Sequence, residues 1–262
     1  MKNRNIILTT ILPVLACFGV SPGARATDVD GVLPGGNNAD GFRVLTNLTT
    51  GGFNTGSGWF SLFSNQGGSF NTAFGAATLF SNTADQNTAT GAGALFNNTT
   101  GVGNTATGAF ALFSNTTAFS NTATGASALL NNILGEGNTA DGVLALGSNT
   151  TGYTNTAIGA HALGSNSTGS NNTALGFGAG GNVTTANNVI CIGTTGANQS
   201  NSCFIGRIFG ATSSGGTAVF INSDGKLGTT TSSRRFKEEI EPMERASEVL
   251  FALKPVTFRY KK

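Results

Sequence analysis

Residues 104–112 read Asn-Thr-Ala-Thr-Gly-Ala-Phe-Ala-Leu, and residues 121–129 repeat them with Ser127 in place of Phe110. The pattern recurs through the middle of the chain at a spacing of 17 residues, with one step of 16. A Gly stands four positions after each leading Asn. In the first seven units a Leu stands eight positions after it and a second Asn eleven positions after it. The leading residues are Asn54, Asn71, Asn87, Asn104, Asn121, Asn138, Asn155 and Asn172.

The period selects the architecture. A 17-residue unit accommodates two strands of about five residues and two tight turns, which make one coil of a β-solenoid. Helical hairpin repeats need about 33 residues, and Gly in every unit would weaken a helix by about 1 kcal/mol each. We therefore predict an all-β fold, a parallel β-solenoid or β-roll over residues 54–182. Strand alternation places Ala89, Gly91 and Leu95 inward, and the Asn columns are expected to form ladders between coils.

One apolar column follows the Leu column directly. If the Leu residues point inward, this column points outward and forms a stripe that should not face water. Side-by-side packing of subunits, most simply as a homotrimer, would cover it. Alternatively, the column lies at a bend and also points inward. Its members are Phe63, Phe80, Phe96, Phe113 and Leu130.

Charge is scarce in the body of the chain. Residues 27–231 hold three basic and seven acidic side chains, whereas residues 232–262 hold thirteen charged ones. This distribution offers no basic stripe for nucleic acid and no acidic cluster for calcium. The one histidine, His161, and two exported cysteines, Cys191 and Cys203, make no zinc site, so no metal or cofactor is expected. The cysteines either form a disulfide or pack as small hydrophobes.

The N-terminus has the pattern of a bacterial export signal. A basic start precedes an apolar run over residues 6–20, and cleavage is expected between Ala26 and Thr27. The apolar run is short and contains Pro13, so no membrane span is expected. We expect a secreted or cell-surface protein whose residues 27–53 cap the solenoid. An alternative is a lipid anchor at Cys17, which follows a loose lipobox.

Residues 104–112 and 155–163, together with residues 188–193, resemble the head repeats of trimeric autotransporter adhesins of the YadA type. The resemblance covers residues 54–193. It implies a left-handed parallel β-roll, assembly of three chains, and a glycan or matrix ligand on a host surface.

Beyond the repeat the pattern changes twice. Residues 183–231 are expected to form an irregular β connector that ends in a hairpin with Asp224-Gly225 in its turn. Residues 242–254 have helical spacing and residues 256–260 alternate like a strand, which predicts a short α+β remnant at the C-terminus.

Residues 232–243 resemble the opening of the intramolecular chaperone auto-peptidase domain of phage tail spikes such as endosialidases. The resemblance implies that Ser232 is a nucleophile, that Lys237 is its base, and that the chain is cut between Thr231 and Ser232. Ser233 stands where that family usually has Asp. The family domain is much longer than residues 232–262, so a truncated domain is expected.

These observations predict an exported structural or adhesive fibre that acts as an enzyme at most once, on itself. An alternative is a flat-faced solenoid that binds ice or polysaccharide through a column of threonines. That column comprises Thr88, Thr105, Thr122, Thr139 and Thr156.

Overall fold

The computed structural model describes residues 31–211, 213–216 and 218–229. The predicted signal peptide with Cys17, Ala26 and Thr27 lies outside the described residues, as do Thr231, Ser232, Lys237 and the predicted helix. The chain divides into two compact units, Met1–Gly210 and Ala211–Lys262.

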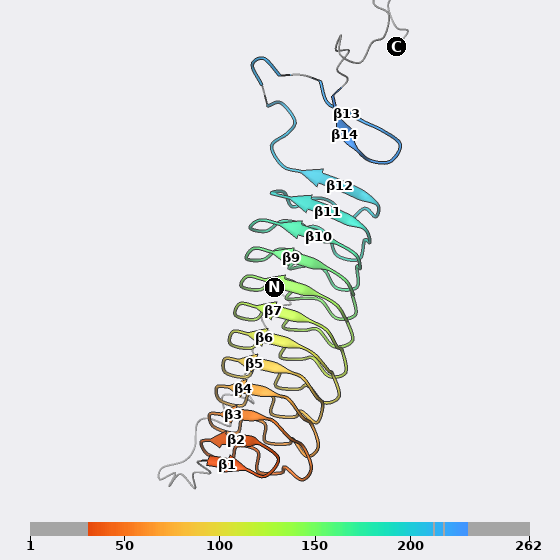
Figure 1. Cartoon of the computed structure of the whole chain (residues 1–262). Coiled ribbons are helices and arrows are strands. Elements are labelled where there is room, and N and C mark those ends of the chain that lie inside the picture. The colour runs from red at the N-terminus through yellow and green to blue at the C-terminus, as the bar shows by residue number, and fades with distance from the viewer. Residues whose placement is uncertain (1–30, 212, 217, 230–262) are drawn as a thin grey trace, which may run out of the picture. The chain divides into compact units, whose positions relative to one another are not determined.

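The first unit is a β-solenoid, which confirms the predicted fold class. Twelve short strands form one sheet in the order of the chain, and from β2 onward each strand lies in the next coil of the stack (Figure 1). The first two strands are antiparallel, and every later pair is parallel. The strands are β1 (Gly31–Leu33), β2 (Asn37–Asp40), β3 (Thr55–Ser57), β4 (Thr72–Phe74), β5 (Thr88–Thr90), β6 (Thr105–Thr107), β7 (Thr122–Thr124), β8 (Thr139–Asp141), β9 (Thr156–Ile158), β10 (Thr173–Leu175), β11 (Val189–Ile192) and β12 (Ser202–Ile205).

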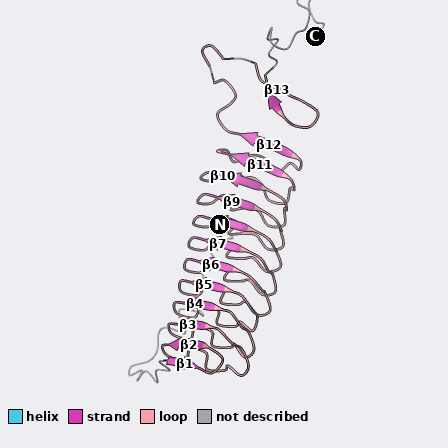
Figure 2. Ribbon diagram, in the orientation of Figure 1, coloured by secondary structure: helices cyan, strands magenta, loops and turns pink. Residues whose placement is uncertain are grey.

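Each coil contains one strand, and the expectation of two strands of about five residues is wrong. The strands have three or four residues, and the rest of each coil is turns and loops (Figure 2). The Gly four positions after each Asn ends the strand: Gly91 has φ +117°, and an added Cβ would lie 2.6 Å from the carbonyl carbon of Gly108 in the next coil. A side chain at this position is therefore excluded.

The Leu column lies in a turn and not in a second strand. Its φ angles are between 48° and 52°, a left-handed conformation that costs a residue with a side chain about 1–3 kcal/mol. The leucines are nevertheless almost fully buried, at 0–3% exposure, so core packing offsets the cost. Backbone hydrogen bonds join the coils here as well, since Leu95 N donates to Ala111 O over 3.0 Å.

The core is thin and built from small residues. Ala89 and Leu95 are buried as predicted, whereas Gly91 occupies the bend between them. Two alanine columns and the leucine column fill the inside of the stack, for example Ala106, Ala111 and Leu112.

The stack of coils is longer than the range that the repeat pattern indicated. Asn37 is buried 17 residues before Asn54, and β2 pairs with β3 in the same register as later strands. At the other end, β11 and β12 continue the parallel sheet beyond residue 182.

The second unit contains the predicted hairpin. β13 (Phe220–Ile221) pairs antiparallel with β14 (Leu227–Gly228). The side-chain oxygen of Asn222 accepts hydrogen bonds from the backbone N–H of Asp224 at 3.1 Å and of Lys226 at 2.8 Å. Gly225 has φ +77° in this turn.

Candidate binding surface on the exposed sheet face

The leading Asn residues form a buried ladder that holds the sheet in register. Each side-chain oxygen accepts a hydrogen bond from the backbone N–H at the equivalent position of the next coil, at 2.8–3.0 Å. Each amide nitrogen donates to a backbone carbonyl near the end of its own coil, at 2.8–2.9 Å. These side chains are 0% exposed, so they stabilise the coils and do not contact a ligand.

A second ladder runs through the Asn residues that stand eleven positions after each leading Asn. Asn98, Asn115, Asn132, Asn149 and Asn166 each donate to the side-chain oxygen of the preceding Asn, at 2.7–3.0 Å.

This second ladder is interrupted between its first two members. The side-chain oxygen of Asn65 is buried without a hydrogen-bond partner. The amide of Asn82 donates to Ala84 O at 2.8 Å, two residues away instead of three. The one 16-residue unit lacks a residue in this turn, which places the Asn82 amide differently from its equivalents.

The exposed face of the sheet carries two parallel columns of side chains. Strands β5 to β8 bury the middle residue and expose the residues on either side, as strand alternation requires. The first outward column, directly after the ladder Asn, is Asn38, Thr55, Thr72, Thr88, Thr105, Thr122, Thr139, Thr156, Thr173, Ile190 and Cys203. The second outward column, two residues later, is Asp40, Ser57, Phe74, Thr90, Thr107, Thr124, Asp141, Ile158, Leu175, Ile192 and Ile205.

The composition of this face changes along the stack. Strands β5, β6 and β7 present Thr in both columns, so hydroxyl groups repeat at the inter-strand spacing of about 4.8 Å. From β9 to β12 the second column is entirely apolar. Asp40 and Asp141 are the charged members of the two columns.

The Phe column is not a stripe facing water. Phe63, Phe80, Phe96 and Phe113 stack on one another with ring centroids 5.0–5.2 Å apart. Phe113 is 5% exposed and Leu130 6% exposed, and the remaining rings are half-buried. The column lies in the turn after the Leu column, so the alternative of a bend describes it better than an outward stripe does.

The two described cysteines lie on opposite faces of the sheet. Cys191 pairs in register with Phe204, and Cys203 pairs with Ile190. Cys191 is buried and Cys203 is exposed, and both thiols are free. Burial raises the pKa of the Cys191 thiol, and neighbouring Cys203 raises it further. Cys191 therefore packs as a small hydrophobe, and no disulfide joins the pair.

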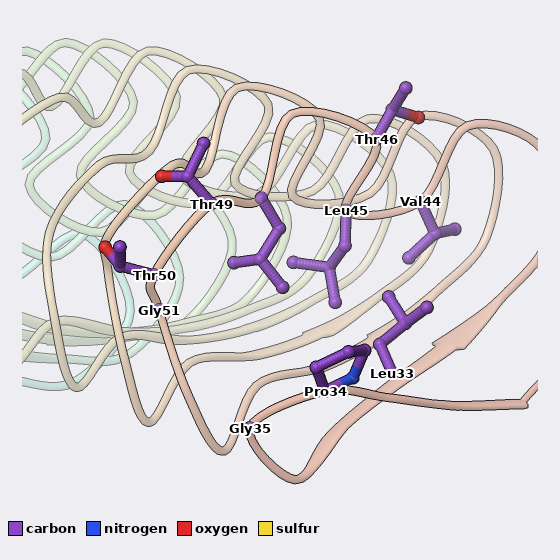
Figure 3. Close-up of a pocket in the computed structure, with 10 residues that line it drawn as sticks. Leu33, Pro34, Gly35, Val44, Leu45, Thr46, Thr49, Thr50 and Gly51 are labelled. Carbon is purple, nitrogen blue, oxygen red and sulfur yellow. The ribbon is translucent and has the colours of Figure 1, made fainter.

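A pocket of about 440 Å³ opens beneath the first coil. Leu33, Pro34, Val44 and Leu45 point toward it from two segments of the chain (Figure 3). Val44 and Leu45 in its wall belong to the apolar core, and the residues that line the pocket include no acid, base or thiol.

Titratable groups are scattered over the described part of the chain. His161 is exposed and contacts Phe177 edge-on, with ring centroids 6.0 Å apart. Over the described residues there is no group of three or more His, Cys, Asp or Glu side chains that could hold a metal ion. The same residues include no helix long and apolar enough to cross a membrane.

Comparisons with protein-family models, with curated proteins and with solved structures found no match for this chain.

Proposed function

We propose that this chain is an exported structural or adhesive fibre whose solenoid associates as a homotrimer and presents a neutral surface to glycan or matrix ligands. The observation that carries the proposal is the exposed face of a single sheet, continuous over β2 to β12 and poor in charge. The ladders beneath that face give every coil the same fixed register. Such a scaffold suits repeated contacts along its length better than chemistry at one point.

The oligomeric state and surface binding of the exported chain test this proposal. Sedimentation of the full chain is expected to give three times the mass of one chain. Binding to a panel of neutral polysaccharides and matrix proteins should persist at high salt, because the solenoid has few charges to screen. A monomer that binds none of these surfaces would refute the proposal.

A second candidate is binding to ice or to an ordered polysaccharide through the Thr columns. It is favoured by strands β5 to β7, where both outward columns are Thr on a regular parallel sheet. The double substitution Thr107→Lys and Thr124→Lys should abolish thermal hysteresis or polysaccharide retention. The control Thr99→Lys, at an exposed turn, should leave either property unchanged. Absence of both properties in the unaltered chain removes this candidate.

The proposed fibre is also expected to cut itself once, before Ser232. In this step the Ser232 hydroxyl attacks the carbonyl carbon of Thr231, and Lys237 takes the hydroxyl proton and passes it to the departing Ser232 nitrogen. Water then hydrolyses the ester, which leaves a carboxylate on Thr231 and restores the hydroxyl. The support is the resemblance of residues 232–243 to a self-cleaving domain.

The intact mass of the exported chain tests the cleavage. A product ending at Thr231 should appear for the unaltered chain and for the control Ser233→Ala, and should be absent for Ser232→Ala. A single uncut species in all three preparations would leave a passive fibre.

A further inference from the structure

Five apolar side chains gather at the C-terminal end of the exposed sheet face. They lie in the two outward columns of β9 to β12, and each is 40–47% exposed. We call this group the apolar end. It comprises Ile158, Leu175, Ile190, Ile192 and Ile205. Phe177, which follows the bend after β10, is 81% exposed.

The fold itself does not require apolar residues at these positions. In β5, β6 and β7 the same two columns are Thr, and those coils have the same register and the same Asn ladder. Thr and Ile are both good strand formers, so strand formation does not distinguish them. Contiguous exposed apolar side chains on a soluble surface mark an interaction site.

We propose that the apolar end is the surface through which three copies of this chain associate, which leaves the outward columns of the earlier strands free. This inference rests on the self-association in the proposed function and names the surface that performs it. The occupant of the apolar end is the same surface of a second copy.

The absence of charge favours a second copy over other partners. Neither outward column has a charged residue from β9 to β12, so the surface offers nothing that would select an acidic or basic partner. A copy of the same surface is apolar in the same places.

The path of the chain also favours this end. After β12 the chain continues into Ala211–Lys262. If copies associate at the last four strands, the segments that follow β12 begin close together. Association at the N-terminal coils would not bring the starts of these segments together.

The Phe column and one further apolar column are weaker candidates. The Phe column covers itself by stacking. A second exposed column, two residues before the ladder Asn, contains Val102, Phe119 and Tyr153, but Glu136 interrupts it. An interface there would place a carboxylate among apolar side chains, which is unfavourable.

The test replaces the apolar end with the residues that the repeat itself uses. A variant with Ile158→Thr, Leu175→Thr, Ile190→Thr and Ile192→Thr should keep the circular dichroism spectrum of the full chain. It should sediment as a monomer where the unaltered chain is a trimer, with association weakened by about a hundredfold or more. The matched control, Val102→Ser with Phe119→Ser, uses the Ser found at the same column in other coils, such as Ser69. This control should remain a trimer.

Cys203 provides a local readout of the same surface. It is exposed beside Ile190, while Cys191 is buried. A water-soluble maleimide should label Cys203 slowly in the trimer and rapidly in the four-Thr variant.

The outcomes separate the two proposals. A folded four-Thr variant that stays trimeric, or a control that dissociates, overturns the inferred surface while the proposed trimer stands. A monomeric unaltered chain whose Cys203 labels at once overturns both the trimer and this inference.

Discussion

Each leading Asn forms hydrogen bonds within its own coil and to neighbouring coils. Asn121 donates to Asn104 in the coil before and to Gly135 O, and its side-chain oxygen accepts from Asn138 N at 2.9 Å. Water cannot replace these partners because the side chain is fully buried. At the scale of the residue, hydrogen bonding therefore stabilises a solenoid whose apolar core is thin.

Asn121→Ala tests this role. The change leaves the Asn138 N–H unpaired inside the stack and removes one of the two hydrogen bonds to the Gly135 carbonyl, which keeps its bond from the Asn132 amide. The free energy of unfolding should therefore fall by about 2 kcal/mol. Chemical denaturation followed by circular dichroism measures it. The control is Asn97→Ser, because other coils already have Ser at this position, as Ser64, Ser81 and Ser114. It should change the free energy of unfolding by less than about 0.5 kcal/mol. Equal losses for both variants would contradict a special role for the ladder.

Glycine at the end of each strand permits the close approach of neighbouring coils. In Gly108→Ala the new Cβ would lie 2.6 Å from the Gly125 carbonyl carbon, at a φ of +133°. We expect a loss of about 3 kcal/mol or more, seen as a lower midpoint of thermal unfolding. Gly103→Ala is the matched control, because nothing lies within 4 Å of its added Cβ and Ser120 adopts a similar φ in the same column. If both variants unfold at the same temperature, the packing argument is wrong.

At the scale of the coil, length controls the second ladder. The unit that starts at Asn71 is one residue short, and the ladder is interrupted at Asn65. The other turns of this kind are closed by an amide that donates to a carbonyl three residues later, as in Asn98 to Gly101 at 2.8 Å. A change of one residue in this turn therefore removes one side-chain hydrogen bond between two coils, while the backbone hydrogen bonds beside it and the leading ladder continue.

Inserting one Thr between Thr83 and Ala84 should repair this defect. The Asn82 amide would then reach the orphaned oxygen of Asn65, and the buried hydrogen bond should add about 1 kcal/mol to stability. A rise in the unfolding midpoint on heating measures the gain. The same insertion between Thr116 and Thr117, in a coil that already has 17 residues, should lower the midpoint. A fall in both variants would mean that the short turn is not the cause of the interruption.

At the scale of the whole molecule, the solenoid behaves as a sum of coils and contacts between neighbours. Its sheet pairs only consecutive strands. The length of the stack is therefore adjustable in steps of one unit, and the exposed face keeps its columns as it lengthens.

Deleting residues 105–121 removes one unit and joins Asn104 to Thr122. Because one whole unit is removed, the repeat positions of the later coils stay aligned with those of the earlier ones. The variant should fold with the same circular dichroism spectrum per residue and a slightly lower midpoint of thermal unfolding. Deleting only residues 105–112 shifts every later column out of step and should leave the chain largely unfolded. Folding of the second variant would show that the register is not set by the ladders.

The amino-acid sequence by itself determined the solenoid. Four columns at one period leave stacked coils as the way to bury the same small residues repeatedly, and the buried ladder Asn and Leu residues follow from that. The hairpin around Asp224-Gly225 was also predictable, because its turn chemistry is local.

Only the tertiary structure decided what the rest of each coil does. Period-two alternation placed Gly91 inward and the Phe column outward, but the left-handed backbone at Leu95 turns the chain there, and the Phe rings stack in the turn that follows. This conformation is intrinsically unfavourable for Leu and persists only because the buried side chain packs in the stack. The apolar end could not be derived from the repeat alone. Ile190, Ile192 and Ile205 lie beyond the last unit that begins with Asn-Thr, and only the pairing of β10 with β11 and of β11 with β12 aligns them with Ile158 and Leu175.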